Sequence, residues 1–131
     1  MHSLVYTSRL LHPFSDAEVP GMLDRWRRRN ERGNITGVLL YNDGAVLQVL
    51  EGSRAAVQDL FAAIAADVRH CAVVRLGDGP VPGRAFADWS LRFHAVDAAD
   101  FARCLQHWKT GSPRAQQLAP LLAGFLASEP W

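Results

Sequence analysis

The sequence is poor in cysteine and contains no long apolar run. Its 131 residues include only Cys71 and Cys104. Because no secretory leader precedes them, we expect two free thiols in a reducing compartment rather than a disulfide scaffold. No apolar run approaches the roughly 18 residues that a membrane-spanning helix needs, so we expect a cytoplasmic protein without a membrane partner.

The sequence also lacks a strong net charge. Its formal charge is +1, with 21% charged and 49% apolar residues. A small net charge gives no general attraction to nucleic acid, and the apolar content argues against disorder. The length is that of one domain, which can bury a stable core without metal or disulfides.

Recognisable catalytic motifs are missing as well. The sequence has neither a G-x-S-x-G elbow nor a phosphate-binding P-loop, and neither cysteine lies in a nucleophile signature. The five histidines show no metal-ligand spacing. We therefore expect a protein that is not an enzyme and that holds no metal. These histidines are His2, His12, His70, His94 and His107.

What the sequence does contain is an alternation of strand and helix patterns. A capping-box pattern at Ser15 to Glu18 precedes the first helix, Asp43 and Gly44 form a hairpin signal, and Ser53 can cap the second helix. In chain order, the pattern first predicts a strand at 3–8 and a helix that ends at 33–34, which either starts at Pro20 or has a distorted first turn. Strands at 35–41 and 45–51 follow, and then a helix that ends at 67–70. The pattern then predicts a strand at 72–76, a Gly/Pro-rich loop at 77–83 and a strand at 88–95.

This order predicts an α+β fold. A βαββαβ arrangement with one extra strand fits a ferredoxin-like sheet with two helices on one face. Residues 1–95 would form this domain. Residues 96–131 would add a C-terminal helical extension on the same domain, with helical spacing at 98–108 and a new helix after Pro113.

Three polar residues are candidates for a ligand site. Gln48 shares a strand face with Val46 and Leu50, and an amide among aliphatic side chains is costly unless it is paired. A structural bond to a loop carbonyl and a bond to a ligand edge both satisfy that requirement. Tyr6 could equally be a core tyrosine, and Asn30 a residue that ends a helix. Together they place a phenol and two amides on three elements that can line one site.

The first helix carries a basic run from Arg25 to Arg32. Arg25, Arg28, Arg29 and Arg32 fall on one helix face, which could bind phosphate or nucleic acid. A solvated basic face explains the same pattern. The near-neutral total charge makes a nucleic-acid partner the weaker interpretation.

Over roughly residues 3–95 the sequence resembles the BLUF domains, which are sensors of blue light using FAD. The resemblance rests on the order and spacing of six blocks rather than on any one of them. These blocks are Leu4 to Ser8, Arg29 with Asn30, Asn34 to Tyr41, Leu47 to Gly52, Asp67 to His70, and Phe86 to Ser90.

The resemblance implies a site for a non-covalent flavin between the two helices, above the sheet. Tyr6 would be the photoactive tyrosine, bonded to Gln48, and Gln48 would contact the N5/O4 edge of the flavin. Asn30 would bond the O4/N3 edge. Asp67, Arg69 and His70 match the stretch that helps to hold the flavin in relatives.

The resemblance also implies a route for the signal. Light would reorder the hydrogen bonds of Tyr6 and Gln48 and bias the fifth strand, with Trp89, Ser90 and Leu91 transferring the change to the helical extension. Because residues 96–131 are too short for an enzyme domain, we expect output to an unknown partner in trans, or through a homo-oligomer.

Two positions depart from the family pattern. Leu91 replaces a frequent methionine, and Ala63 replaces an arginine near the end of the second helix. The second change leaves FAD and FMN both open as the flavin, with Arg28 or Arg29 as a replacement phosphate contact. The alternatives to a photoreceptor are a small flavin- or ligand-dependent enzyme on this fold and a nucleic-acid-binding module that uses the Arg25–Arg32 face.

Overall fold

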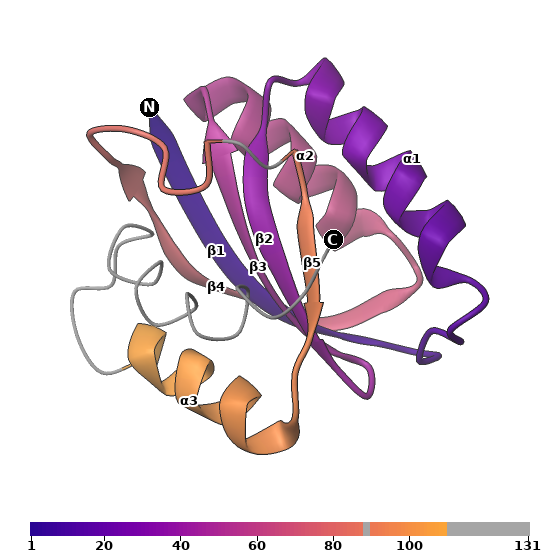
Figure 1. Cartoon of the computed structure of the whole chain (residues 1–131). Helices are drawn as coiled ribbons and strands as arrows, with labels where there is room; N and C mark the ends of the chain where they lie inside the picture. Colours follow the sequence, from indigo (N-terminus) through magenta and orange to yellow (C-terminus); the bar gives the residue numbers. More distant parts are fainter. Residues whose placement is uncertain (88–89, 110–131) are drawn as a thin grey trace.

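The computed structural model describes residues 1–87 and 90–109 and contains one five-stranded sheet (Figure 1). The strand order is β4-β1-β3-β2-β5, with β5 parallel to β2 and the other neighbours antiparallel. This confirms the ferredoxin-like α+β fold with an extra strand. The elements are β1 (His2–Leu10), α1 (Val19–Arg32), β2 (Thr36–Asn42), β3 (Ala45–Gly52), α2 (Arg54–Ala66), β4 (His70–Pro80), β5 (Arg92–Ala95) and α3 (Ala98–Lys109).

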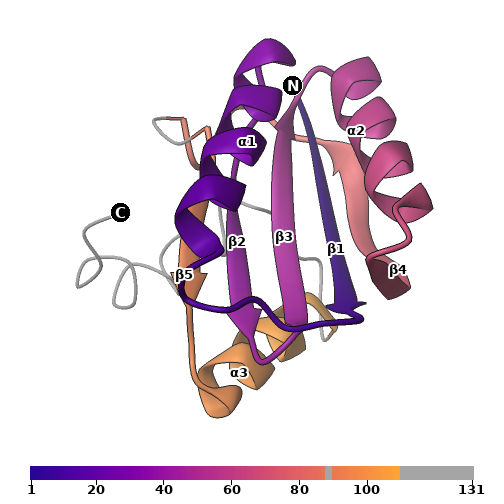
Figure 2. The same cartoon turned by 90° about the vertical axis from the view of Figure 1, so that its right-hand side faces the viewer.

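The sheet separates two apolar layers. Helices α1 and α2 cover one face, side by side, and α3 covers the other (Figures 1 and 2). Side chains alternate between these layers along each strand. On β3, for example, Val46 and Leu50 pack beneath α1 and α2, whereas Leu47 and Val49 pack on the side of α3.

The β2–β3 hairpin follows from its turn residues. Asp43 and Gly44 have φ of 44° and 89°, the left-handed values that a two-residue hairpin turn of this hand requires. Gly37 allows the two strands to approach closely, because a Cβ at this position would lie 1.9 Å from the carbonyl oxygen of Val49. The hairpin brings Gln48 opposite Leu39 on β2.

Helix α2 begins with the predicted cap, whereas α1 begins at Val19 with Glu18 as N-cap and without a side-chain cap, so the predicted capping box forms only in the turn before it. Pro20 lies in the first turn of α1, where its missing N–H costs no helical hydrogen bond. The Glu18 carboxylate accepts from the backbone N–H and hydroxyl of Ser15, at 3.1 and 2.8 Å, in the turn before the helix. Ser53 caps α2 by accepting from the Ala56 N–H at 3.2 Å.

The predicted extent of β4 is wrong. The strand continues through Gly77 and Gly79 to Pro80, because β1 provides pairing partners along this whole length. Strand β4 is an edge strand, and proline is tolerated there because one side of the strand makes no ladder.

The predicted extent of β5 is also wrong. The strand starts at Arg92, because its pairing with β2 covers only Val38 to Tyr41. Phe93 therefore lies in β5, and Leu91 is buried just before it. Trp89 lies outside the described residues.

Helix α3 confirms the predicted helical segment that starts at 98. Phe101 and Cys104 pack against the sheet in the apolar layer opposite α1 and α2. The second predicted helix, after Pro113, lies outside the described residues. Within 1–87 and 90–109, none of the helices is long and apolar enough to cross a membrane.

Candidate functional site

Tyr6 and Gln48 form a buried pair in the middle of the sheet. They are direct cross-strand partners on β1 and β3, and both side chains point toward the layer below α1 and α2. Tyr6 is 1% exposed and Gln48 is 2% exposed, and the phenol donates a hydrogen bond to the amide oxygen Oε1. The Gln48 oxygen thus accepts a hydrogen bond from a phenol on the neighbouring strand.

The environment keeps the Tyr6 phenol protonated. Burial raises the pKa of Tyr6 well above its usual value of 10.0, and the nearby Arg29 guanidinium opposes this only in part. The ring also packs against Phe61 of α2, with centroids 5.5 Å apart. At neutral pH Tyr6 is therefore a fixed hydrogen-bond donor beside the amide.

Asn30, at the end of α1, has an open acceptor. Its side chain is fully buried, and its Nδ2 donates to the carbonyl of Ser90 at 2.6 Å. Its Oδ1 is buried and has no hydrogen-bond partner among the described residues. Buried polar atoms are nearly always paired, so this acceptor is available for a further hydrogen-bond donor.

Arg29 lies on the side of α1 that faces the Tyr6–Gln48 pair. Its side chain is half-buried, and its Nε likewise has no hydrogen-bond partner within the described part of the chain. Burial is the main effect that lowers the pKa of Arg29, although the guanidinium remains charged at neutral pH. This places an unsatisfied donor beside the phenol.

Asp67, Arg69 and His70 lie where the chain passes from α2 into β4, with His70 as the first residue of β4. The Arg69 guanidinium donates to the Asp67 carboxylate at 2.6 and 3.0 Å, and these bonds hold the pKa of Asp67 well below its usual value. His70 Nδ1 lies 3.1 Å from the Ser8 hydroxyl, and burial lowers the pKa of His70. The Asp67–Arg69 ion pair and the contact of His70 with Ser8 on β1 thus fix this segment against the sheet.

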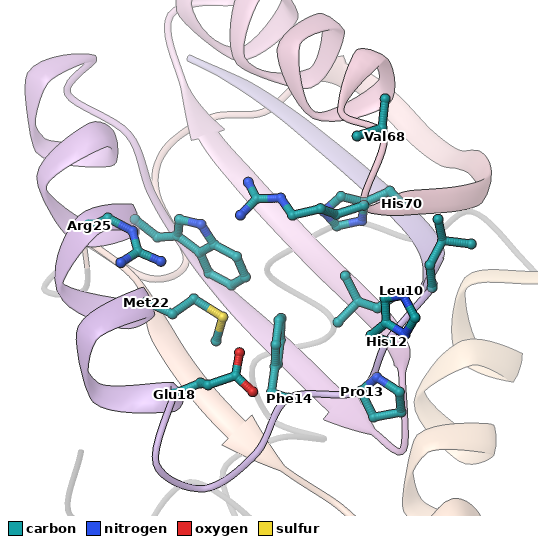
Figure 3. A pocket seen from close by; sticks show the side chains of 12 residues that line it. Leu10, His12, Pro13, Phe14, Glu18, Met22, Arg25, Val68 and His70 are labelled. Carbon is teal, nitrogen blue, oxygen red and sulfur yellow. The ribbon is translucent and has the colours of Figure 1, made fainter.

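All of these site residues except Asn30 line one or both of two adjoining cavities between α1 and the segment after α2. A narrow inner pocket of about 10 Å³ touches the Tyr6–Gln48 pair, and an outer cavity of about 670 Å³ lies toward Phe14 (Figure 3). Both are lined by Trp26, Arg69 and His70. The remaining walls of the inner pocket are Tyr6, Arg29, Leu39, Gln48, Ile64 and Asp67.

The hydrogen-bonding groups of these residues match those of a flavin ring. A flavin ring offers carbonyl acceptors and one N–H donor along a single edge, which match the Gln48 amide and the open Asn30 acceptor. The outer cavity has the volume of a typical ligand site. The inner pocket has room for about one water molecule, so a ring reaches Tyr6 only when a wall side chain moves. Trp26, which is half-buried, lies in the wall shared by the two cavities.

The segment before β5 is tied to α1. The Ser90 carbonyl accepts from Asn30, and the Leu91 carbonyl accepts from Arg27 Nε at 3.0 Å. The Leu91 side chain is 3% exposed and belongs to the same apolar cluster as Tyr6. Of the three residues that the sequence assigns to signal transfer, two therefore contact the site's surroundings, and Trp89 lies outside the described residues.

The basic face of α1 is divided rather than continuous. Arg28 pairs with Asp24 at 2.9 Å on the surface, Arg25 lines the outer cavity, and Arg29 turns toward the inner pocket. A nucleic-acid backbone needs several aligned, unpaired cations. The division of this face therefore argues against the nucleic-acid interpretation.

Sequence reasoning missed Trp26, a wall residue of both cavities, and Ser8, which contacts the wall residue His70. Trp26 was expected only as part of the apolar stripe of α1, and Ser8 had no expected role. A tryptophan that follows the apolar stripe but stays half-exposed is a typical sign of a ligand wall. Recognising this sign requires knowing where the neighbouring helix lies, and the sequence alone does not give that position.

Comparison with known proteins identifies the same family over most of the chain. The BLUF family model, described as sensors of blue-light using FAD, matches residues 1–92. The photoactivated adenylate cyclase subunit beta of Euglena longa is 37% identical over 90 residues, which are 68% of this chain but 10% of that protein. The blue light- and temperature-regulated antirepressor BluF of Escherichia coli (strain K12) is 31% identical over 100 residues, 72% of this chain and 25% of that protein.

Solved structures give the same result. The dark-state structure of the BLUF protein BlrB has a TM-score of 0.71 and 32% identity, covering 94% of this chain and 95% of BlrB. The photo-activated state of BlsA has a TM-score of 0.73 and 26% identity, covering 98% and 96%. The chain thus spans nearly all of these proteins but only about a tenth of the Euglena longa cyclase subunit. It belongs to the BLUF family, the sensors of blue light that use FAD.

Proposed function

We propose that this chain binds a flavin non-covalently between α1 and α2 and signals by a light-induced change in the hydrogen bonds of Tyr6 and Gln48. The observation that carries this proposal is the buried bond from the Tyr6 hydroxyl to the Gln48 amide oxygen. The bond joins a redox-active phenol to a side chain that is both donor and acceptor. It lies at the inner end of the cavity system described above.

The bound flavin supplies the absorption of blue light and an excited state that accepts electrons. Tyr6 would supply an electron and then its proton to that acceptor and would take both back to close the cycle, and it holds the proton in the dark because burial disfavours the phenolate. The hydrogen bond to Gln48 fixes where that proton can go. Because Tyr6 and Gln48 are both at most 2% exposed, bulk water does not compete for it.

Gln48 is the element that changes. Its amide presents an oxygen to Tyr6 in this arrangement, and rotation or tautomerisation exchanges donor and acceptor toward the pocket. A new donor directed at a ring carbonyl lowers the excitation energy, which gives a red shift without a covalent bond. Two arrangements of similar free energy make the change reversible.

We further propose that the rearranged hydrogen bonds alter the segment before β5, and that this segment transmits the light signal out of the site. Asn30 binds the Ser90 carbonyl with one end of its amide, and the oxygen at the other end has no partner among the described residues. A shift of Asn30 therefore acts on Ser90 and Leu91. Strand β5 leads from there directly to α3.

For the cofactor, we propose FAD as the preferred flavin and FMN as a weaker ligand. The basis is the outer cavity, which extends the inner pocket by about 670 Å³. Asp67, Arg69, His70 and Arg29 would hold the flavin from the side of α2 and α1. The Ala63 position is exposed on α2 and offers no charge.

The output is proposed to be a partner protein in trans or a homo-oligomer, and not catalysis by this chain. Curated relatives are named as adenylate cyclase subunits and as an antirepressor, and this chain matches a small part of each. Within 1–87 and 90–109, no group of three potential metal ligands is present. The exposed free thiol of Cys71 favours a reducing compartment, and we place the protein in the cytoplasm.

The test is an absorption spectrum of the purified chain loaded with flavin, recorded in the dark, under blue light and after return to darkness. We expect a flavin band that shifts to longer wavelength under light and returns in the dark. A flavin that binds but only bleaches, or that stays unchanged, would contradict the proposed photoreceptor.

A further inference from the structure

Strand β4 has a bulge beside Tyr6. Val5 of β1 lies opposite Gly77, but the next residue, Tyr6, lies opposite Arg75, so that Leu76 is an extra residue in the ladder. Leu76 packs in the apolar layer on the side of α3. Because residues directly opposite each other project to the same face of a sheet, the bulge turns Arg75 to the face of α2 and of the Tyr6 phenol.

The bulge also makes an ion pair possible. Residues three apart in a regular strand project to opposite faces. Here Arg75 and Asp78 share the α2 face, and the guanidinium donates to the carboxylate at 2.9 Å. Gln58 of α2 donates to the same carboxylate at 2.9 and 3.0 Å, and His2 of β1 is a further partner. Asp78 is thus held by three elements and fixes the position of Arg75.

One aromatic ring separates Arg75 from Tyr6. The guanidinium carbon of Arg75 lies 4.7 Å from the ring centroid of Phe61, and that centroid lies 5.5 Å from the ring centroid of Tyr6. Phe61 comes from α2, which lies over β1 and β4 (Figure 2). A cation over an aromatic face is attracted to it, so the ring and the ion pair together hold this charge in place. Neither Phe61 nor Arg75 is among the residues that line the two cavities.

We propose that Arg75 is a positioning residue for the photochemistry of Tyr6: its charge, held over Phe61 and balanced by Asp78, sets the rate at which the phenol gives up its electron. This inference rests on the proposed function, in which Tyr6 gives one electron and then its proton to the excited flavin and takes both back. Between the two transfers the Tyr6 ring carries a positive charge. A nearby cation disfavours that charge, and a nearby carboxylate favours it.

The experiment measures the fluorescence lifetime of the bound flavin in two variants that change the local charge in opposite senses. Arg75→Met removes the cation and leaves the carboxylate, so we expect electron transfer to be about threefold faster and the lifetime to be shorter. Asp78→Asn leaves the cation unbalanced, so we expect transfer to be about threefold slower and the lifetime to be longer. The factors are small because the Arg75 side chain is 48% exposed and solvent screens its charge.

The direction of the two changes separates an effect of charge from an effect of structure. Both variants break the same ion pair, so a role limited to structure would change the lifetime in the same direction in both. Arg75→Lys keeps the charge and should stay close to the wild type. Since surface ion pairs contribute little to stability, all three variants should fold, which denaturant unfolding checks.

The ion pair between Arg103 and Asp100 of α3 is the matched control. These residues are also three apart and are joined at 2.7 Å, but α3 covers the opposite face of the sheet (Figure 1). Arg103→Met and Asp100→Asn should therefore leave the lifetime of the bound flavin unchanged.

A second measurement uses the flavin-free chain with carbon-13 in its tyrosines. The chain has only two tyrosines, Tyr6 and Tyr41, so their NMR signals are readily assigned with Tyr6→Phe. The signal of the Tyr6 phenol carbon should move in opposite directions in Arg75→Met and Asp78→Asn. The signal of Tyr41 should stay where it is in the wild type.

Three results would overturn the inference. Unchanged lifetimes in Arg75→Met and Asp78→Asn, or lifetimes that change in the same direction, would show that this charge does not act on Tyr6. An equal change in Arg103→Met would show a general charge effect. If the wild-type chain still shows the reversible red shift in these cases, the proposed photoreceptor stands without this role of Arg75. A wild-type chain that binds flavin without a red shift defeats both.

Discussion

The two faces of the sheet are built from similar apolar residues but treat their buried polar groups differently. The face below α1 and α2 holds Tyr6 and Gln48, bonded to each other, beside an Asn30 acceptor and an Arg29 donor without partners in the described chain. The face covered by α3 holds the buried polar residues Ser3 and His94 and, at its end, one buried carboxylate, Glu51.

Glu51 is satisfied on all sides. Its carboxylate accepts from the backbone N–H groups of Ala85 and Phe86, at 2.6 and 3.0 Å, and from the Thr36 hydroxyl at 3.0 Å. Its side chain thereby anchors the segment between β4 and β5. Arg84 reinforces the same segment by donating to the Glu51 carbonyl at 3.0 Å.

This difference distinguishes buried polar groups that stabilise the fold from buried polar groups that are available to a ligand. A buried polar group with every bond made stabilises one arrangement, and its loss is expressed as a loss of stability. A buried polar group with open bonds is costly to the fold and is retained for a ligand. Substitutions on the two faces should therefore have different consequences.

The largest expected effect comes from Tyr6→Phe on the α1 and α2 face. We expect the light-induced red shift to disappear completely, because the phenol that supplies the electron and proton is gone. Binding of flavin should change by less than about threefold, since the ring of Tyr6 remains. Tyr41→Phe is the matched control and should keep the shift, which light-minus-dark absorption measures. A normal shift in Tyr6→Phe would remove Tyr6 from the proposed role.

The corresponding change on the α3 face is Glu51→Ala. We expect a loss of about 3 kcal/mol in the free energy of unfolding, because two buried N–H groups lose their acceptor. Denaturant unfolding gives the value, and the exposed Glu31→Ala serves as control. The remaining folded protein should keep its red shift. Near-wild-type stability in Glu51→Ala would contradict the structural assignment of this carboxylate.

A third substitution compares two similar amide bonds. Asn30→Ala removes the open acceptor near the end of α1, and we expect flavin to bind about tenfold more weakly, the value of one hydrogen bond. Asn42→Ala removes an amide that donates to the Val96 carbonyl at 2.9 Å, away from the cavities, and should leave affinity unchanged. Equal effects in flavin titrations of the two variants would show that Asn30 acts only through the fold.

The smallest expected effect is a dependence of stability on alkaline pH. Burial raises the pKa of Tyr6 above 10.0, so above that pH the unfolded chain loses this proton while the folded chain keeps it. The contribution of Tyr6 to stability is complete below pH 10 and falls by about 1.4 kcal/mol per pH unit above it. Unfolding of the flavin-free chain from about pH 8 to about pH 11 should show this decline, and Tyr6→Phe should lack that part of it. Parallel curves would contradict a buried phenol.

Much of the fold could be predicted from local sequence signals. Asp43 and Gly44 dictate the hairpin, Ser53 caps α2, and the alternation on β3 places Gln48 with Val46 and Leu50. The limits of β4 and β5 could not be predicted, because they depend on how far β1 and β2 offer partners. Strand pairing over that length is a property of the sheet, not of Gly77 or Pro80.

The candidate site shows the same limit. The residue types of Tyr6, Gln48 and Asn30 could be read from the sequence, but the bond between the first two depends on the β1–β3 register. The opposite orientations of Arg28 and Arg29 depend on where α1 lies relative to α2. Trp26 becomes a shared wall only once the segment after α2 is in place.

The most direct test of the central claim is a light-minus-dark infrared difference spectrum of the flavin-loaded chain with its glutamines labelled with carbon-13. If the bond between Tyr6 and Gln48 is the light-sensitive element, amide carbonyl bands will move with the label in the wild type and will vanish in Gln48→Leu. Label-sensitive bands that persist in Gln48→Leu, or a red shift with no such bands, would contradict the account.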